Sequence, residues 1–149
     1  MILGIGVDLV EVARLGRALD RFGEKLLSRL FHGSEAAHCG NRRDRAECLA
    51  GIFAAKEAFL KALGTGLAQG VKWLDMEVIW NKDNSPHLRV GGRAREIMTG
   101  LGAGDSLVSI SHDGGFALAM VLLQSRQERG PAHGKSPEAR SPGLFTTGG

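Results

Sequence analysis

The chain has 149 residues, about the length of one domain, and its 43% hydrophobic and 23% charged residues are ordinary for a soluble globular protein. This composition excludes a chain that is disordered or fibrous throughout, and the length buries a core without a structural metal. The two cysteines, Cys39 and Cys48, have neither CxxC spacing nor His partners at zinc-finger spacing. The sequence therefore predicts no zinc site and no disulfide scaffold, and favours a reducing, cytoplasmic location.

The net charge of +3 is concentrated at the end of the chain. Residues 1–124 carry 15 Lys and Arg against 14 Asp and Glu, whereas residues 125–149 carry 4 against 2. This nearly neutral body argues against nucleic-acid binding. The apolar start reaches Asp8 too early for a signal peptide, and no apolar run approaches the ~18 residues of a membrane span. We therefore expect a protein that binds neither nucleic acid nor membranes.

Strands and helices are predicted in an irregular order. In chain order the patterns predict a strand at 2–8, helices at 12–30 and 45–63, strands at 75–80 and 87–90, a helix at about 93–101, and strands at 107–111 and 116–123. The strands come in adjacent pairs rather than alternating with helices. This order predicts an α+β fold in which an antiparallel sheet packs against a long helix.

Local signals mark the ends and faces of these elements. Gly64 follows the second long helix as a left-handed C-terminal cap. After Gln124 the composition changes to Gly, Pro, Ser and basic residues, so we predict one domain over residues 1–124 and a disordered tail over 125–149. Apolar residues at spacings of three and four define a core face on the first helix: Leu15, Leu19, Phe22, Leu26 and Leu30.

The segment from Gly51 to Gly66 is the first candidate for chemistry. Glu57 and Lys61 stand one helical turn apart, which on its own indicates a surface ion pair worth ~0.2–0.5 kcal/mol. The turn at 64–66 can present backbone N–H groups to an anion, although a simple helix stop needs no ligand. Three small residues would let a bulky group approach this helix closely: Ala54, Ala55 and Ala58.

Asp8 and His112 are the other two candidates. Asp8 together with Glu11 fits a helix capping box, but Asp8 could instead point into a cleft as an oxygen ligand. One strand carboxylate and one helix carboxylate, completed by phosphate oxygens and water, are typical of a Mg²⁺ site. His112 lies at the mouth of the last hairpin, where a lone histidine is usually structural or exposed. Beside a phosphate-bearing cofactor it would donate to the phosphate or shuttle a proton.

Three motifs, in this order, resemble the holo-acyl-carrier-protein synthase family of phosphopantetheinyl transferases. They are GIGVD at 4–8, FAAKEA at 53–58 followed by KA at 61–62 and GTG at 64–66, and SISH at 109–112. The resemblance covers about residues 1–124. It implies a phosphopantetheinyl transferase-like fold and transfer of the 4′-phosphopantetheine arm of coenzyme A to a serine of apo acyl carrier protein, with adenosine 3′,5′-bisphosphate as by-product.

The resemblance also implies roles for particular residues. Asp8 and Glu57 would hold a catalytic Mg²⁺ against the pyrophosphate of coenzyme A, and Lys61 would neutralise phosphate charge. Gly64 and His112 would lie at the cofactor. Either Glu57 or a Mg²⁺-bound water would be the base. Members of the family are typically homotrimers whose active sites lie between neighbouring subunits.

The sequence departs from the family pattern at one position of the second motif. The residue before Phe53 is commonly Arg in the family, whereas this chain has Ile52. If that Arg helps to hold the phosphates, another basic residue must compensate for it. The candidates are Arg42, Arg43 and Arg45.

A basic stripe follows the first predicted helix at spacings of three and four: Arg14, Arg17, Arg21, Lys25 and Arg29. Such a stripe is most often a solvated face. Because acyl carrier proteins are strongly acidic, it also suits electrostatic steering of that partner.

Two other functions would use the same features. A hydrolase of coenzyme A or nucleotide pyrophosphates would use the same carboxylates with water as the nucleophile, and would consume coenzyme A without a carrier protein. A non-enzymatic helical module would bind an acidic protein or nucleic acid through the basic stripe, and would not need Asp8 or Glu57.

Overall fold

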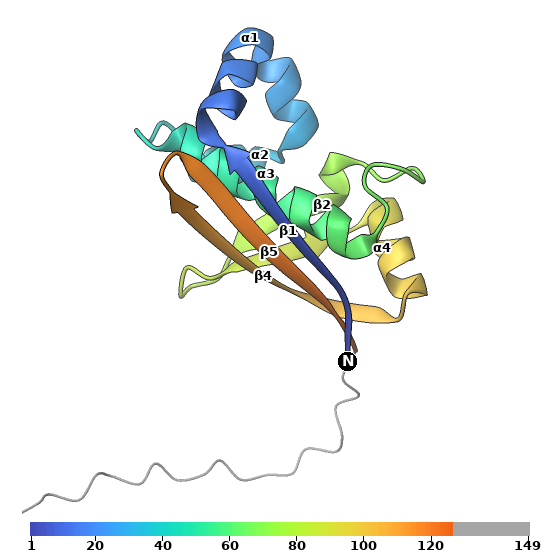
Figure 1. The fold of residues 1–149 in the computed structure, drawn as a ribbon. Helices are drawn as coiled ribbons and strands as arrows, with labels where there is room; N and C mark the ends of the chain where they lie inside the picture. Colours follow the sequence, from blue (N-terminus) through green and yellow to red (C-terminus); the bar gives the residue numbers. More distant parts are fainter. Residues whose placement is uncertain (127–149) are drawn as a thin grey trace, which may run out of the picture.

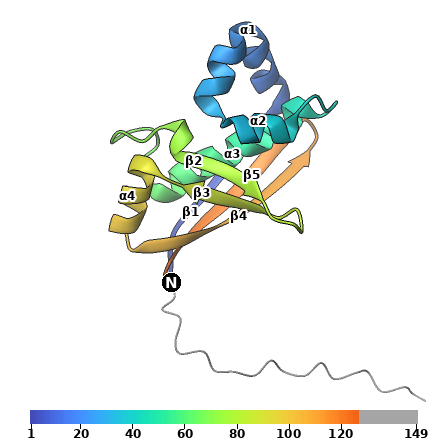
Figure 2. The ribbon, with the colours of Figure 1, turned by 180° about the vertical axis from the view of Figure 1, so that it is seen from behind.

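A three-stranded antiparallel sheet runs along one side of a long central helix, and a two-stranded hairpin covers the other side (Figures 1 and 2). The computed structural model describes residues 1–126. Its elements are β1 (Ile2–Glu11), α1 (Val12–Leu30), α2 (Gly33–Cys39), α3 (Arg45–Leu63), the short 3-10 turn η1 (Trp73–Asp75), β2 (Met76–Trp80), β3 (Pro86–Val90), α4 (Gly92–Gly100), β4 (Ala103–Asp113) and β5 (Phe116–Ser125). The strand order β1-β5-β4 confirms the predicted α+β fold with an antiparallel sheet against a long helix.

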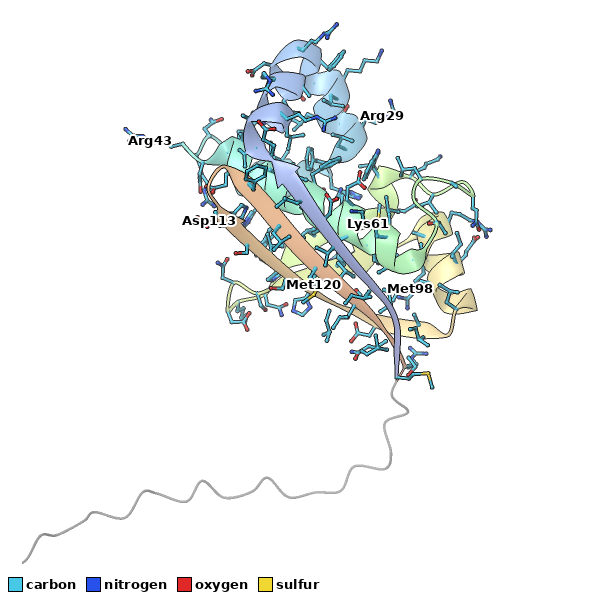
Figure 3. The ribbon with its side chains drawn as sticks, in the orientation of Figure 1. Arg29, Arg43, Lys61, Met98, Asp113 and Met120 are labelled. Atoms are coloured by element: carbon cyan, nitrogen blue, oxygen red, sulfur yellow. A yellow bond between two sulfur atoms is a disulfide. The ribbon has the colours of Figure 1, made fainter. Side chains whose placement is uncertain are left out.

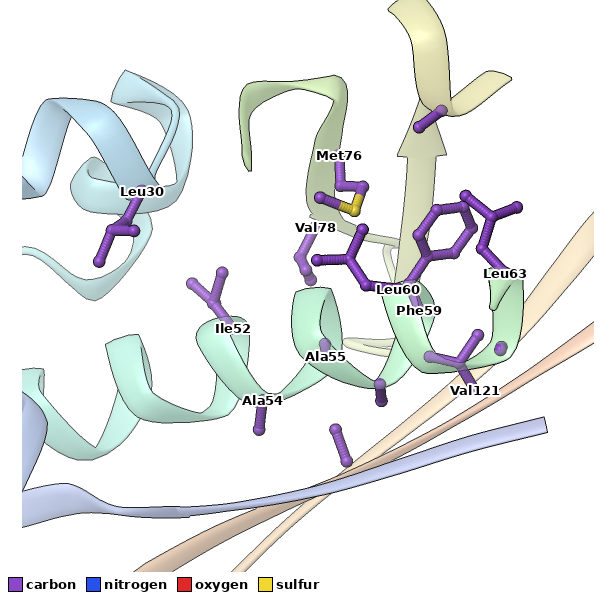
Figure 4. Packing of buried hydrophobic residues seen from close by; sticks show 14 of the residues in the cluster. Leu30, Ile52, Ala54, Ala55, Phe59, Leu60, Leu63, Met76, Val78 and Val121 are labelled. Atoms are coloured by element: carbon purple, nitrogen blue, oxygen red, sulfur yellow. The ribbon is translucent and has the colours of Figure 1, made fainter. Parts of the chain in front are cut away.

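The central helix α3 is buried on both sides (Figure 4). Ala54 faces the three-stranded sheet, whereas Ile52 and Leu60 point toward Met76 and Val78 of β2. A helix that is apolar nearly all round belongs in a core, which explains why α3 lies between the two sheets.

Two glycines bring β1 into direct contact with α3. A Cβ atom on Gly6 would overlap the carbonyl oxygen of Ala58, and one on Gly4 would overlap that of Ala62. Glycine therefore allows the strand backbone to lie against the helix backbone. The small side chains of α3 admit this strand and the core, rather than a bulky ligand as their pattern had suggested.

The first helix differs from its prediction in the middle. Gly23 has φ 57° and ψ −142°, and this break divides α1 into two segments that stand apart from the sheet (Figure 1). Leu15 and Leu30 are buried as predicted, but Phe22, beside the break, is 55% exposed and is not part of the core. A spacing pattern assumes one continuous helical twist, and the glycine interrupts that twist.

The structure also revises three local expectations. Helix α2 was not predicted, and β1 continues three residues past Asp8 to Glu11. Cys39, at the end of α2, forms a disulfide with Cys48 near the start of α3, with 5.6 Å between their Cα atoms. The expectation that these cysteines would not pair was wrong, because it rested on spacing patterns and not on where the loop between the helices returns.

The last strand ends at Ser125, and the predicted tail lies, from residue 127, outside the described residues. No helix within residues 1–126 is both long enough and apolar enough to cross a membrane.

Candidate active site

Two carboxylates from different elements share one cavity. Asp8 comes from β1 and Glu57 from α3, and both line a cavity of about 490 Å³ between β1, α1 and α3. Burial raises the pKa of Glu57, the negative charge of Asp8 raises it further, and the Lys61 ammonium partly offsets both. The two carboxylates therefore lie close enough for their negative charges to repel each other, as carboxylates that share a cation do.

Lys61 bonds to Asp8 and not to the glutamate one turn before it. Its Nζ donates to Oδ1 of Asp8 and to the carbonyl oxygen of Val7, each at 2.9 Å. Figure 3 shows Lys61 on α3 alongside β1. The predicted ion pair between Glu57 and Lys61 is therefore not formed, and Lys61 instead links α3 to β1.

The capping interpretation of Asp8 is wrong. The N-cap of α1 is Glu11, which makes no side-chain capping hydrogen bond, and Asp8 lies inside β1 opposite Ala119 of β5. The side chain of Asp8 is only 15% exposed. It is therefore free of a capping role and lies in the cavity wall.

Both segments of α1 contribute to the wall of this cavity. Arg14 and Leu15 come from the first segment, Leu26 and Leu30 from the second, and Phe53 of α3 completes the apolar side. The break at Gly23 lets α1 fold over the cavity from two directions. The cavity is acidic where β1 meets α3 and apolar beneath α1.

His112 lies in a different cavity of about 310 Å³ near the start of α3. One of its ring nitrogens, Nε2, is 3.0 Å from the carbonyl oxygen of Glu47. The ring sits where a side chain on Gly51 would be, since a Cβ there would come within 2.7 Å of Nε2. Within one chain the structure therefore does not bring His112 together with Asp8 and Glu57.

The His112 cavity contains one of the three basic residues proposed to compensate for Ile52. Arg42 lines it and bonds to Asp44 through Nε and Nη2, at 2.8 and 2.7 Å. Ile52 is buried at its base, whereas Arg43 extends away from the molecule (Figure 3).

An aromatic stack closes another side of this cavity. The ring of His38 lies 3.7 Å from that of Trp80, nearly parallel to it. Burial lowers the pKa of His38, and the nearby charge of Arg42 lowers it further. The cavity therefore combines a fixed guanidinium, two imidazoles and a flat aromatic surface.

Gly64 caps α3 as predicted. Its φ of 80° is left-handed, and its N–H donates to the carbonyl oxygens of Leu60 and Lys61. This N–H is therefore used by the helix end, and the role of Gly64 at a cofactor remains a prediction.

Sequence reasoning missed a buried ion pair next to Glu57. Lys56 is fully buried, and its Nζ donates to Oε2 of Glu35 and to the carbonyl oxygen of Leu30, each at 2.7 Å. Burial lowers the pKa of Lys56, and the charge of Glu35 opposes this. A signal was present in the sequence: Ile52, Lys56 and Phe59 follow the core spacing of α3, so the lysine stands at a core position.

The five basic residues of α1 are all exposed, but they do not form one stripe. Arg14 lines the carboxylate cavity, Arg17 lies 4.0 Å from Glu11, and the guanidinium of Arg21 stands 5.1 Å above the ring of Phe22. Lys25 and Arg29 follow the break at Gly23. Their role in binding a partner remains a prediction.

Within residues 1–126 no three or more His, Cys, Asp or Glu side chains gather to hold a metal ion. The carboxylate cavity thus offers a cation two protein ligands. Such a set suits a cation that also takes phosphate oxygens and water, as Mg²⁺ commonly does.

The fold places two carboxylates at one cavity, and comparison with known proteins identifies the chain as a transferase. Residues 4–121 match the 4′-phosphopantetheinyl transferase superfamily. The chain belongs to this family, and the predicted phosphopantetheinyl transferase is confirmed.

Relatives and solved structures agree with this assignment. The chain is 47% identical over 125 residues to the holo-[acyl-carrier-protein] synthase of Trichlorobacter lovleyi, which covers 84% of this chain and 99% of that protein. The Helicobacter pylori holo-[acyl-carrier-protein] synthase in complex with coenzyme A matches with a TM-score of 0.71 and 34% identity, over 80% of this chain and 99% of that one. The Neisseria meningitidis enzyme gives a TM-score of 0.76 at 29% identity, over 84% and 100%.

Proposed function

We propose that the protein transfers the 4′-phosphopantetheine arm of coenzyme A to a serine of apo acyl carrier protein, with Mg²⁺ as cofactor. The products are holo acyl carrier protein and adenosine 3′,5′-bisphosphate. The observation that carries this proposal is that Asp8 and Glu57 line one cavity and that Lys61 bonds to Asp8. The names of the relatives, and the coenzyme A complex of the Helicobacter pylori enzyme, support the choice of substrates.

The donor set fits a magnesium ion that is shared with a pyrophosphate. Asp8 and Glu57 are two hard oxygen ligands. Burial raises the pKa of Glu57 and the charge of Asp8 raises it further, and a divalent cation between the two carboxylates would relieve their repulsion. When bound, Mg²⁺ supplies a Lewis acid that stabilises negative charge on the pyrophosphate. Asp8 and Glu57 would be the protein ligands of the Mg²⁺, and substrate oxygens would be its other ligands.

Lys61 and Glu57 supply the remaining chemistry. The Lys61 ammonium is 54% exposed and lies beside Asp8, so it can turn to neutralise a phosphate oxygen during the transfer. Either Glu57 or a water bound to the Mg²⁺ would accept the proton of the attacking serine hydroxyl.

The carrier protein would dock on α1, directly above the cavity. Arg14 belongs both to the cavity wall and to the exposed basic residues of this helix. An acidic protein attracted by Arg14, Arg17, Arg21 and Lys25 would therefore present its serine beside the carboxylates.

We further propose that the working unit is a homotrimer, as the family resemblance implies, and that it acts in the cytoplasm. The outer face of the three-stranded sheet, turned away from α3, supports association, because it is apolar and exposed on neighbouring strands. Its members are Ile5, Val7, Leu9, Leu107, Phe116, Leu118 and Met120, each between 41% and 62% exposed. Monomeric proteins rarely expose so continuous an apolar face. A neighbouring copy would also bring a His112 cavity to the carboxylates of this chain.

The direct test is mass spectrometry of apo acyl carrier protein after incubation with coenzyme A, Mg²⁺ and the protein. We expect the carrier to gain the mass of one phosphopantetheine arm. The gain should disappear when the metal is chelated and return when Mg²⁺ is restored. Consumption of coenzyme A without a carrier would instead indicate the hydrolase.

Three matched variants locate the chemistry. Asp8→Asn and Glu57→Gln should each abolish transfer, because a hard cation loses an oxygen ligand. Glu11→Gln removes a third carboxylate from the wall of the same cavity and should leave transfer nearly unchanged. Full activity of a folded Asp8→Asn protein would overturn the metal assignment.

A further inference from the structure

The disulfide between Cys39 and Cys48 borders the His112 cavity but has no part in the proposed transfer. It joins the last residue of α2 to the fourth residue of α3. Cys39 is completely buried, whereas Cys48 is half-buried and lines the cavity. One sulfur is thus open to small molecules that enter the cavity, and the other is protected behind it.

The short loop that this bond closes carries the polar groups of the cavity. Arg42 and Asp44 lie in the loop, and within residues 1–126 their side chains hydrogen-bond only to each other. The carbonyl oxygen of Glu47, one residue before Cys48, is the contact of His112. The position of the guanidinium therefore depends on where this loop is held, whereas His112 lies on β4 and meets the first turn of α3 that follows the loop.

The ends of the loop are anchored unequally without the disulfide. On the α3 side, Leu49 and Ala50 are fully buried in the core. On the α2 side, the stack of His38 on Trp80 holds the helix end, and Gly40 follows with a left-handed φ of 50°. Lys56 of α3 and Glu35 of α2 join the two helices further along, and the disulfide is the link that holds them together at the loop itself.

We propose that Cys39 and Cys48 form a redox-active pair whose oxidation state sets how firmly the His112 cavity binds the phosphate-bearing part of the substrate. Arg42 and His112 are suitable donors to a phosphate because one is a permanent cation and the other can donate from its ring. In the oxidised protein the loop holds Arg42 in the cavity that His112 also lines. In the reduced protein the loop gains freedom, and binding must first order it. The link to coenzyme A rests on the proposed function, whereas the redox chemistry does not.

The exchange needs only a low-molecular-weight disulfide as oxidant. The thiolate of Cys48 attacks one sulfur of that disulfide, forms a mixed disulfide and releases one small thiolate. Cys39 then loses its proton, and its thiolate attacks the Cys48 sulfur and releases the second small thiol. Two electrons pass from the protein thiols to the oxidant, which leaves as two thiols. A small thiol, including coenzyme A itself, drives the reverse reaction.

This chemistry fits a pair in a reducing compartment. Disulfides in such compartments are usually transient and serve catalysis or redox sensing. A bond in a cavity wall, with one reachable sulfur, has the access that exchange requires.

The first measurement follows the thiols without reference to activity. The protein is equilibrated with mixtures of reduced and oxidised glutathione, alkylated and weighed by mass spectrometry. We expect one cooperative two-electron transition between a form with two alkyl groups and a form with none. Thiols that stay alkylated at every ratio, or a disulfide that resists every ratio, would overturn the proposal.

The second measurement compares the oxidised and reduced forms of the wild-type protein. We expect the dissociation constant of adenosine 3′,5′-bisphosphate and the apparent KM for coenzyme A to rise about two- to tenfold on reduction, the range expected when one or two groups must be ordered on binding. The value of kcat and the KM for the carrier protein should stay the same. Equal affinities in the two forms would refute the coupling, and the nucleotide titration gives this answer even if the protein transfers nothing.

A double variant separates the bond from the reagents. Cys39→Ala with Cys48→Ala should bind like the reduced protein whether or not a reductant is present. Circular dichroism of this variant reports whether it is folded, and the wild-type comparison remains decisive if it is not. A response of the double variant to reductant would show that another group is the target.

Discussion

Replacement of Lys56 by Met tests whether the buried ion pair holds the helices around the active site together. Lys56 and Glu35 are both fully buried, and three donors converge on Glu35: Nζ of Lys56 and the backbone N–H groups of His32 and Val78, each at 2.7 Å. Lys56→Met leaves the carboxylate with the two backbone donors and no counter-charge. It also leaves the carbonyl oxygen of Leu30 without its side-chain donor.

The cost follows from this uncompensated charge. Removal of one partner of a buried pair typically costs about 3–5 kcal/mol, a large part of the 5–15 kcal/mol that stabilises most domains. For a chain of this size the melting temperature should fall by roughly 10–15 °C. Lys61→Met is the matched control, because this lysine is on the same helix and its pair with Asp8 is 54% exposed on the lysine side. Its loss should change the free energy of unfolding by less than about 1 kcal/mol.

Urea unfolding of the two single variants and of Glu35→Gln with Lys56→Met completes the test. The neutral glutamine leaves no buried charge, although its one carbonyl oxygen can accept from only one of the two backbone donors, which reach separate oxygens of Glu35. The double variant should therefore recover part of the stability that Lys56→Met loses. A Lys56→Met protein within 1 kcal/mol of the wild type would refute the reasoning. So would a double variant no more stable than the single one.

Three further predictions concern the carboxylate cavity and its surroundings. Gly6→Ala should lower the free energy of unfolding, measured in urea, by about 1–3 kcal/mol and should also lower the transfer rate. The added methyl group meets the carbonyl oxygen of Ala58 and pushes β1, with Asp8, away from α3. Gly91→Ala is the control, because a Cβ atom there meets nothing within 4 Å. Glu57→Gln should melt higher than the wild type at pH 7, with the difference shrinking toward pH 4. Because the pKa of Glu57 is raised in the folded protein, the protonated side chain stabilises the fold below the unfolded pKa, and this stabilisation is lost as the pH rises through the folded pKa. Glutamine does not ionise, so it keeps the stabilisation at pH 7. A lower melting temperature of the variant at pH 7 would contradict this. The double variant Arg14→Glu with Arg21→Glu should raise the KM for the carrier protein several-fold at low salt and leave the KM for coenzyme A unchanged. An unchanged KM for the carrier would mean that the basic residues of α1 are only a solvated face.

Residues that end helices and form turns made much of the fold predictable. Helix α3 begins and ends where predicted, at Arg45 and Leu63, because a left-handed glycine stops it. The final hairpin follows from two Val- and Leu-rich runs around Gly114 and Gly115. These signals act over a few residues, so a sequence shows them directly.

The features that the sequence did not reveal depend on contacts between distant elements. The disulfide forms because α2 and α3 return beside each other, and α2 itself was not predicted. The break at Gly23 leaves the spacing of leucines unchanged, so periodicity could not show that Phe22 faces outward. Lys56 stands at a core position in the sequence, but only the tertiary fold places Glu35 beside it.

The candidate site divides in the same way. The pairing of Asp8 with Glu57 was predicted from the motifs, and the structure places both at one cavity. The position of Lys61 on Asp8 was not, because it depends on the close approach of β1 that Gly4 and Gly6 allow.

One strand links the active site to the proposed association of subunits. Side chains alternate along β1, so Asp8 points toward the helix side while Val7 and Leu9 point outward on the apolar face, opposite Met120 and Leu118 of β5. Leu9 also lines the carboxylate cavity, whereas Leu118 does not. A charge at Leu118 should therefore act on assembly without touching the cavity.

Leu118→Asp tests this link. Leu118 is 41% exposed in the single chain, so an aspartate there should be tolerated by the fold but should break an association that buries it. We expect light scattering to show a trimer for the wild type and single chains for the variant, and transfer to fall with it, because each chain then lacks the His112 cavity of a neighbour. Leu101→Asp, 48% exposed and between α4 and β4, should keep both the trimer and the activity. A Leu118→Asp protein that is a fully active single chain would mean that one chain holds a complete site, and that the carboxylates work without the His112 cavity.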